Sequence, residues 1–221
     1  LPPPSTAHVM FADFRANPMA NPLATPSGKI EIFSQTIAGF DYDDCAPHPC
    51  WFEPPEWLGS LDRGSRLHLL GNQPTARLHS QLDHGSISRD AKIAGHEPVK
   101  INRQDAAERA IKNGDIVRLC NDRGSCLCGA IVSDEVMQGV LIVSTGAWFD
   151  PDPSGASGLS CHHGNPNVLT PDLGTSKLAQ GPAAHSCLVE VEKWTGGAVA
   201  MTAHKPPVIE DGRHQKPKAT A

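Results

Sequence analysis

Amide side chains gather in two glycine-bordered segments of this 221-residue sequence and in the loop that follows. These amides are Asn72, Gln73, Asn165, Asn167 and Gln180. An amide both donates and accepts hydrogen bonds, so such a set suits a ligand whose rim presents both kinds of group. Gly71 and Gly164 would let the backbone approach a ligand closely, because glycine has no Cβ. The same residue types commonly form turns, and taken alone they favour turns.

Cationic and hydroxyl side chains follow the first amide pair. Arg77, His79 and Ser80 could supply charge-assisted contacts to an anion such as phosphate. If residues 74–82 form a helical turn, Arg77 and Gln81 lie one turn apart on one face, while His79 and Ser80 point elsewhere. Not all of these side chains could then touch one ligand.

Cysteines and histidines suggest metal chemistry as an alternative. Cys126 and Cys128 are separated by one residue, and Cys161 precedes His162 and His163. Zinc sites usually pair ligands two to four residues apart in two knuckles. A one-residue spacer inside a predicted strand directs both side chains to one face without the turn that a knuckle needs. We therefore expect structural cysteines and no metal ligands.

Alternating apolar residues predict the strands that would position these groups. The expected strands cover residues 66–70, 98–101, 115–120, 125–132, 140–143 and 187–191. Residues 121–124 form a turn that makes the third and fourth of them an antiparallel hairpin. A short helix is expected between the second and third strands, with Asn102 as its N-cap and Gly114 at its end. A helix framed by short strands is typical of a small closed barrel.

The apolar face of that helix is assigned to alanine and isoleucine side chains, namely Ala106, Ala107, Ala110 and Ile111. Along the chain, composition predicts four regions that differ in structure. They are an extended arm at 1–28, a strand (29–33) with a long connecting loop at 29–65, the barrel at 66–195, and a flexible tail at 196–221. The loop at 150–184 is long enough inside a compact domain to indicate function.

Composition excludes several classes of partner. The net charge of −5 and pI near 6.1 provide no basic field for nucleic acid or anionic lipid. No apolar stretch approaches the length of a membrane span, and Leu1 begins no signal-peptide pattern, so we expect a soluble fragment. Seven cysteines are an odd number and imply no disulfide framework. With 20 glycines and 20 prolines, the chain is expected to be mainly β with long loops.

Three segments in order carry a resemblance to a known family. They are residues 25–31 (TPSGKIE), the run 70–81 (LGNQPTARLHSQ), and residues 164–180, which open with GNPNVLT. Together they resemble the C-terminal region of bacterial S- and N-oxide reductases of the dimethyl sulfoxide reductase family, over most of residues 9 to 204. The elements HSQ (residues 79–81) and NPN (residues 165–167) resemble those of one subgroup, the trimethylamine N-oxide, dimethyl sulfoxide and biotin sulfoxide reductases.

The resemblance implies a six-stranded double-psi β-barrel that packs against bis(molybdopterin guanine dinucleotide) and its molybdenum. The remaining domains of the same enzyme would supply the serine that binds the metal, and a small S- or N-oxide would be the substrate. No residue of this chain is expected to be catalytic, so the fragment alone would be inactive. The compartment, bacterial cytoplasm or periplasm, stays open.

The resemblance also implies the residues that contact the cofactor. These are Asn72, Gln73, Arg77, His79, Ser80, Gln81, His163, Asn165, Asn167, Asp172 and Gln180. Asn72 and Asn165 rank above Arg77, Ser80 and Gln81 as contacts. With His79 and Gln180 they are expected to line one concave surface. His79 is equally compatible with a buried histidine whose hydrogen bonds are satisfied.

Three further residues keep two readings each. His163 could contact the cofactor or be a buried, satisfied histidine, and Asp172 could accept from a pterin amino group or cap the turn at 174–176. Trp148 could border the substrate funnel, although plugging the barrel is the commoner role of a single tryptophan. For the whole chain, the alternatives are a free-standing barrel that binds proteins and a Cys/His metal-binding protein.

Overall fold

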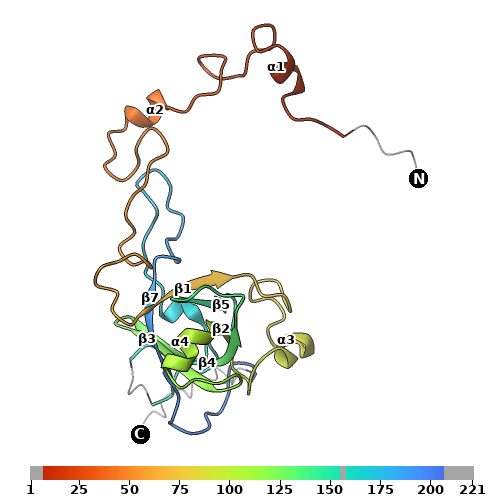
Figure 1. Ribbon diagram of the computed structural model, residues 1–221. Helices are drawn as coiled ribbons and strands as arrows, with labels where there is room; N and C mark the ends of the chain where they lie inside the picture. The colour runs from red at the N-terminus through yellow and green to blue at the C-terminus, as the bar shows by residue number, and fades with distance from the viewer. Residues whose placement is uncertain (1–6, 155–157, 207–221) are drawn as a thin grey trace, which may run out of the picture. The chain divides into compact units, whose positions relative to one another are not determined.

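The computed structural model of the chain describes residues 7–154 and 158–206 (Figure 1). The described residues form two compact units. One is drawn from Leu1–Glu53 and Gly174–Gly181, and the other from Pro54–Leu173 and Pro182–Ala221. The second unit contains every strand, so the barrel lies within it.

Six strands of the second unit close into a barrel. They are β1 (Leu67–Asn72), β2 (Pro98–Asn102), β3 (Ile116–Asn121), β4 (Gly124–Ser133), β5 (Val140–Ser144) and β7 (Leu188–Lys193). The order is β2-β5-β1-β7-β3-β4, and a β2–β4 pairing closes the ring. The expected six-stranded double-psi barrel is confirmed. The two-residue β6 (Ser160–Cys161) pairs in parallel with Ser125 and Cys126 at the start of β4.

Alternation along the strands explains where the core lies. In β1, Leu67 and Leu69 are buried while the residues after them are partly exposed, and β3 buries Val117 and Leu119 in the same way. These side chains meet Leu141 of β5 and the other inward-facing residues in one hydrophobic cluster. Burying a side chain of this size contributes about 1.5–3 kcal/mol, so this cluster stabilises the barrel.

The parallel pairing of β1 with β5 determines where two important loops begin. His68 pairs with Val140 and Asn72 pairs with Ser144, so both strands end at the same edge of the barrel. Parallel neighbours direct their carboxyl ends the same way. The chain leaving β1 at Gln73 and the chain leaving β5 at Thr145 therefore start side by side.

The predicted hairpin and helix are present, with one changed boundary. β3 and β4 pair antiparallel, as expected. Helix α4 (Arg103–Glu108) begins after Asn102 but ends before Gly114, because Ala110 adopts a left-handed backbone with φ of 52°. That turn brings Ile111 into the core, whereas Ala107 and Ala110 are exposed. The predicted apolar face is therefore wrong at those two alanines.

Asn102 joins α4 to the barrel through two hydrogen bonds. Its Oδ1 accepts from the amide of Gln104 at 2.9 Å, and its Nδ2 donates to the carbonyl of Val136 at 2.7 Å. We expect Asn102→Ala to lower the free energy of unfolding of the chain by about 1–2 kcal/mol. Asn102→Ser should restore about half of the loss, because serine keeps the cap alone. Urea unfolding measures both, and an unchanged Asn102→Ala variant would contradict this role.

The first unit differs from the sequence-based expectation. The segment predicted to be extended contains the short helix α1 (Ala12–Ala16). The side chain of Asn21 donates to the carbonyls of Asp13, inside the helix, and of Asn17, just past it. The predicted strand at 29–33 is absent: no neighbouring strand offers it a ladder, and Ile30 is 72% exposed. Helix α2 (Gln35–Ala38) follows, capped by Ser34.

The remaining described elements are helix α3 (Ser86–Asp90) and the 3-10 turn η1 (Pro166–Val168). Among residues 7–154 and 158–206, no helix has the length and apolar character that a membrane crossing requires. The predicted tail at 196–221 lies partly outside the described residues, from 207 onward. Its described portion is held against the barrel, since Thr202 donates its amide hydrogen to Asp150 at 2.8 Å.

Candidate functional site

Two loops meet at the barrel edge where β1 and β5 end. The carbonyl of Asn72 accepts from the amide of Thr145 at 2.9 Å, and its side-chain oxygen accepts from the Ser144 hydroxyl at 2.9 Å. Further along, Gly146 has φ of +88°, and a Cβ there would lie 2.1 Å from the carbonyl oxygen of His79. Only glycine allows the two backbones to approach this closely.

Trp148 fastens the same two loops together. Its indole Nε1 donates to the carbonyl of Ser80 at 2.8 Å. Its ring lies 5.3 Å from that of His84 and 5.5 Å from that of His204, centroid to centroid. Of the two readings of Trp148, the plug of the barrel is not observed, because the residue is half-buried and lies outside the core cluster. Its hydrogen bond to the loop decides its position.

A closed square of four buried charges lies beneath these loops. Arg77 contacts Asp83 at 3.3 Å and Glu97 at 3.1 Å, and Lys92 contacts the same two carboxylates at 2.9 and 2.7 Å. All four side chains are at most 3% exposed. Two acids and two bases alternate, so the square carries no net charge. Pairing and hydrogen bonding of this kind are what make buried charges tolerable.

Asp83 accepts more hydrogen bonds than any simple ion pair requires. Besides the two cations, it accepts from the hydroxyl of Ser88 at 3.1 Å, the amide of Trp148 at 3.1 Å and Nε2 of His204 at 3.1 Å. Burial acts to raise the pKa of Asp83, but the hydrogen bonds from Lys92, Trp148 and His204 outweigh it. They hold the pKa of this carboxyl well below its usual range.

His163 lies next to Asp83 and is buried. Its Nδ1 is 2.9 Å from the carbonyl of Trp148, an acceptor, so Nδ1 carries the proton. Its Nε2 has no hydrogen-bond partner among the described residues. Burial, reinforced by the charge of Lys92, lowers the pKa of His163, and the ring is neutral at pH 7. Asp83, His163 and His204 stand close enough to hold a cation. The donors and two cations already on Asp83 favour the ion network instead.

The buried histidines predict how stability depends on pH. Burial lowers the pKa of both His163 and His96 from 6.5 in the folded chain. Below about pH 6.5 the unfolded chain therefore binds more protons than the folded chain, and stability falls as pH is lowered through this range. Urea unfolding between pH 7.5 and 5 should show this decline, with a shallower slope in His163→Gln. An equal slope in that variant would contradict the assignment to His163.

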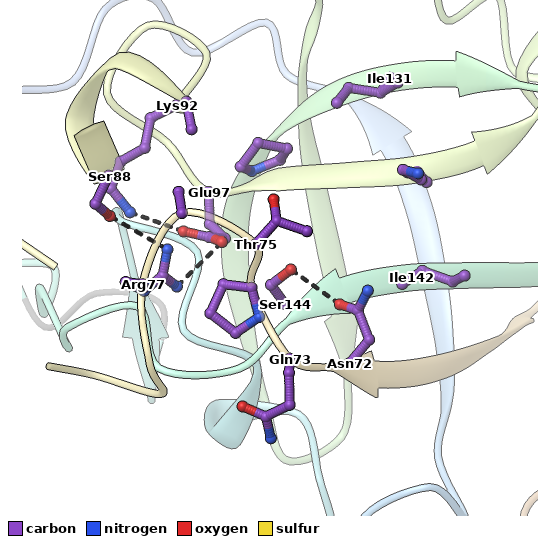
Figure 2. A pocket seen from close by; sticks show the side chains of 15 residues that line it. Asn72, Gln73, Thr75, Arg77, Ser88, Lys92, Glu97, Ile131, Ile142 and Ser144 are labelled. Carbon is purple, nitrogen blue, oxygen red and sulfur yellow. Dashed lines mark hydrogen bonds and ion pairs between the residues drawn. The ribbon is translucent and has the colours of Figure 1, made fainter. Parts of the chain in front are cut away.

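Three of the predicted contact residues, Asn72, Gln73 and Arg77, line a cavity of about 230 Å³, shown in Figure 2. Asn72 lies beside Ser144 and is hydrogen-bonded to it, and Gln73 points away from the charged square. Arg77 lies at its inner end, but its guanidinium nitrogens are occupied: besides the two carboxylates, they donate to the carbonyls of His79 and Thr145. This geometry favours a role for Arg77 in holding the loops.

The next three predicted contacts lie on an exposed turn. His79, Ser80 and Gln81 are all exposed, and the amide of Gln81 donates to the carbonyl of Leu78 at 2.9 Å. Residues 74–82 form no helical turn, because His79 has φ of 49°. His79 is therefore not a buried histidine, and its imidazole is free to meet a ligand from outside.

The Gly164 segment approaches the charged square from the other side. A Cβ on Gly164 would lie 2.7 Å from Cβ of Glu97, so the chain passes directly against that residue. Asn165 accepts from the amide of Asn167 at 2.9 Å and caps η1, while Asn167 is exposed. Asn165 thus serves as a turn former here, whatever else it contacts.

Asp172 and Gln180 are less closely tied to the other contacts. Asp172 is exposed in the loop after η1. Gln180 belongs to the first unit, where its amide donates to the carbonyl of Ser176 at 2.8 Å. Asn72, His79 and Asn165 belong to the barrel unit. The expected surface shared by all four residues stays a prediction.

Sequence reasoning did not find Asp83, Lys92, Glu97 or His204. Each is isolated in the sequence, with no motif spacing that points to the others. The one available signal is Glu97, an acid immediately before the strand β2 with its buried Val99. The cysteines behave as expected of structural residues: all seven are free thiols, and Cys126 and Cys128 lie in the core with their sulfurs 3.9 Å apart.

Comparison with known proteins identifies relatives over most of the chain. The family described as "Molydopterin dinucleotide binding domain" matches residues 67–188. Trimethylamine-N-oxide reductase 1 of Escherichia coli O157:H7 is 50% identical over 198 residues, covering 88% of this chain and 23% of the relative. Dimethyl sulfoxide/trimethylamine N-oxide reductase of Cereibacter sphaeroides is 48% identical over 200 residues, covering 90% and 24%.

The fold also has a solved counterpart. Acetylene hydratase from Pelobacter acetylenicus matches with a TM-score of 0.61 at 19% identity, covering 80% of this chain and 25% of that one. At this identity the likeness concerns the fold alone. The chain spans about a quarter of the length of the curated relatives that it matches.

Proposed function

Because the chain belongs to the molydopterin dinucleotide binding domain family, we propose that it binds a molybdopterin guanine dinucleotide where the loops after β1 and β5 meet. The observation that carries this proposal is the parallel register that pairs Asn72 with Ser144. It brings the turn at 78–81 and the glycine-bordered loop at 145–148 to one edge of the barrel.

The residues present fit this group. A pterin presents ring nitrogens, an amino group and a carbonyl, which amide and imidazole side chains can match. His79, Gln81 and Asn167 are exposed and carry such groups, and the exposed hydroxyl of Ser80 also donates and accepts hydrogen bonds. His79 has a left-handed backbone and Gly146 has no Cβ. Together these features let the turn at 78–81 approach the loop at 145–148 closely.

The remaining predicted contacts have graded roles in the proposal. Asn72 and Gln73 approach the ligand from the end of β1. Arg77 and His163 are buried and support the site by hydrogen bonds to the loop at 145–148. Asn165 shapes the turn that presents Asn167. Asp172 is proposed as an outer contact, in the loop that follows η1, whereas Gln180 of the first unit stays a prediction.

For the complete protein we propose reduction of small S- or N-oxides, because relatives named trimethylamine-N-oxide and dimethyl sulfoxide reductases match most of this chain. A bis(molybdopterin guanine dinucleotide) with molybdenum would supply the oxygen-transfer chemistry. The barrel residues bind and orient that group, while other domains of the enzyme bind the metal and the substrate.

Cofactor analysis of the complete enzyme tests the proposal. We expect two pterins per molybdenum and release of guanosine monophosphate on acid hydrolysis. The double substitution Ser80→Ala/Gln81→Ala should lower cofactor content severalfold, because it removes exposed hydrogen-bonding groups from the turn. Arg103→Ala, in an exposed ion pair with Asp134 on the barrel, is the matched control. Full cofactor content in the double variant would contradict the proposed site.

A further inference from the structure

Residues 201–205, called the strap below, run back against the barrel edge that carries the proposed site. The amide of Thr202 donates to Asp150 at 2.8 Å, and its hydroxyl donates to the other oxygen of the same carboxylate. The amide of Lys205 donates to the carbonyl of Thr202 at 2.9 Å, which closes a turn. Thr202 therefore holds the strap on Asp150, and the turn that follows places His204 against Asp83.

His204 contacts Asp83, one of the four members of the charged square. Its Nε2 lies 3.1 Å from Oδ2 of Asp83, and its side chain is 21% exposed where that of Asp83 is fully buried. Its ring meets the ring of His163 edge-on, with centroids 4.8 Å apart at 90°. A histidine N–H bonded to a carboxylate is a charge-assisted contact and stronger than a neutral hydrogen bond.

Trp148 connects His204 to the exposed turn. The imidazole of His204 lies on one side of the indole, at 5.5 Å and 75°, and His84 makes the second ring contact. The same Asp83 oxygen that meets His204 accepts from the backbone amide of Trp148 at 3.1 Å. The indole in turn holds the carbonyl of Ser80. A continuous series of contacts thus runs from the strap to the turn.

We propose that His204 is a positioning residue, which holds Trp148 and the turn 78–81 in the conformation that receives the dinucleotide. The inference rests on the proposed function, because it concerns how the same site is prepared. The turn carries left-handed residues at His79 and Leu82, with φ of 49° and 57°. Such backbone conformations persist only where neighbouring contacts enforce them, and a loop ordered in advance binds more tightly.

The test uses the complete enzyme and two readouts besides activity. The first is amide hydrogen exchange, compared between residues 78–84 and strands β3 and β4. The second is the rate at which the dinucleotide leaves the protein, followed by pterin fluorescence in the filtrate. We expect His204→Ala to speed both exchange at 78–84 and dinucleotide release by about tenfold, with exchange in the strands unchanged.

Two further variants separate positioning from general stability. His204→Gln keeps an N–H that can reach Asp83, and it should restore most of the wild-type behaviour. Arg103→Ala removes an exposed ion pair with Asp134 and should change neither readout. If every substitution at position 204 lowered the stability of the barrel, His204→Gln would not restore the wild-type behaviour.

Several results would overturn the inference. Equal acceleration of exchange in β3, β4 and residues 78–84 would mean that His204 acts on global stability. Unchanged exchange at 78–84, or faster exchange without faster release, would show that His204 does not prepare the site. If the wild-type enzyme held no dinucleotide at all, the proposed function would fail first, and the inference with it.

Discussion

Replacing Lys92 with methionine is expected to lower the free energy of unfolding of the chain by about 3–5 kcal/mol. Lys92 is 2% exposed and contacts both Asp83 and Glu97. Its loss leaves two buried carboxylates facing the single charge of Arg77. The cost comes from the uncompensated charge, since methionine fills a similar volume.

A double substitution separates charge balance from packing. In Lys92→Met/Glu97→Gln one acid and one base are removed together, and Arg77 and Asp83 remain as a neutral pair. We expect the double variant to be more stable than the sum of the two single effects by about 1–3 kcal/mol. Urea unfolding of the four proteins gives the coupling energy.

Lys100→Met is the matched control, because Lys100 is 42% exposed in its ion pair with Glu135. An exposed pair of this kind contributes about 0.2–1 kcal/mol. Additive effects in the Lys92 and Glu97 cycle, or an equal loss in Lys100→Met, would contradict the account of a closed charged square.

Gly146→Ala is expected to be the most damaging single change at the barrel edge. An alanine there must adopt φ of +88° and place its Cβ 2.1 Å from the carbonyl oxygen of His79. Strained backbone alone costs about 1–3 kcal/mol. Because the obstructing atoms are backbone, the turn at 78–81 must move, and the complete enzyme should lose most of its cofactor.

Gly114→Ala isolates the backbone contribution. Gly114 has φ of +86°, nearly that of Gly146, but nothing lies within 4 Å of its Cβ position. We expect Gly146→Ala to be less stable than Gly114→Ala by at least about 2 kcal/mol in urea unfolding. Cofactor content should fall only in Gly146→Ala, and equal behaviour of the two variants would contradict the close approach of the loops.

The barrel was accessible from the sequence because local patterns dictate its strands. Leu67 and Leu69 alternate with less buried residues, and so do Val117 and Leu119. Such alternation reports directly which face of a strand is buried. Asn102 marked the start of α4 for an equally local reason, since a cap bonds to an amide two residues away. A small closed barrel was expected from the order of these elements, whereas the closing pair of strands, β2 and β4, was not predicted.

The site was only partly accessible, because its contacts are made between distant segments. Asp83 and His204 are 121 residues apart, and nothing near either one indicates the other. The amides and residues 79–81 stood out by residue type and by resemblance, whereas the burial of Arg77 has no local signature and was not expected. The predicted strand at 29–33 failed for a related reason: alternation without a partner strand forms no ladder.

The most direct test of the central claim is a crystal structure of the complete enzyme with its cofactor bound. We expect the dinucleotide to lie within hydrogen-bond distance of the turn at 78–81 and of the Gly164–Asn167 segment. Arg77 and Asp83 should stay buried beneath the turn, without contact to the ligand. A dinucleotide bound entirely by other domains, with this turn facing solvent, would contradict it.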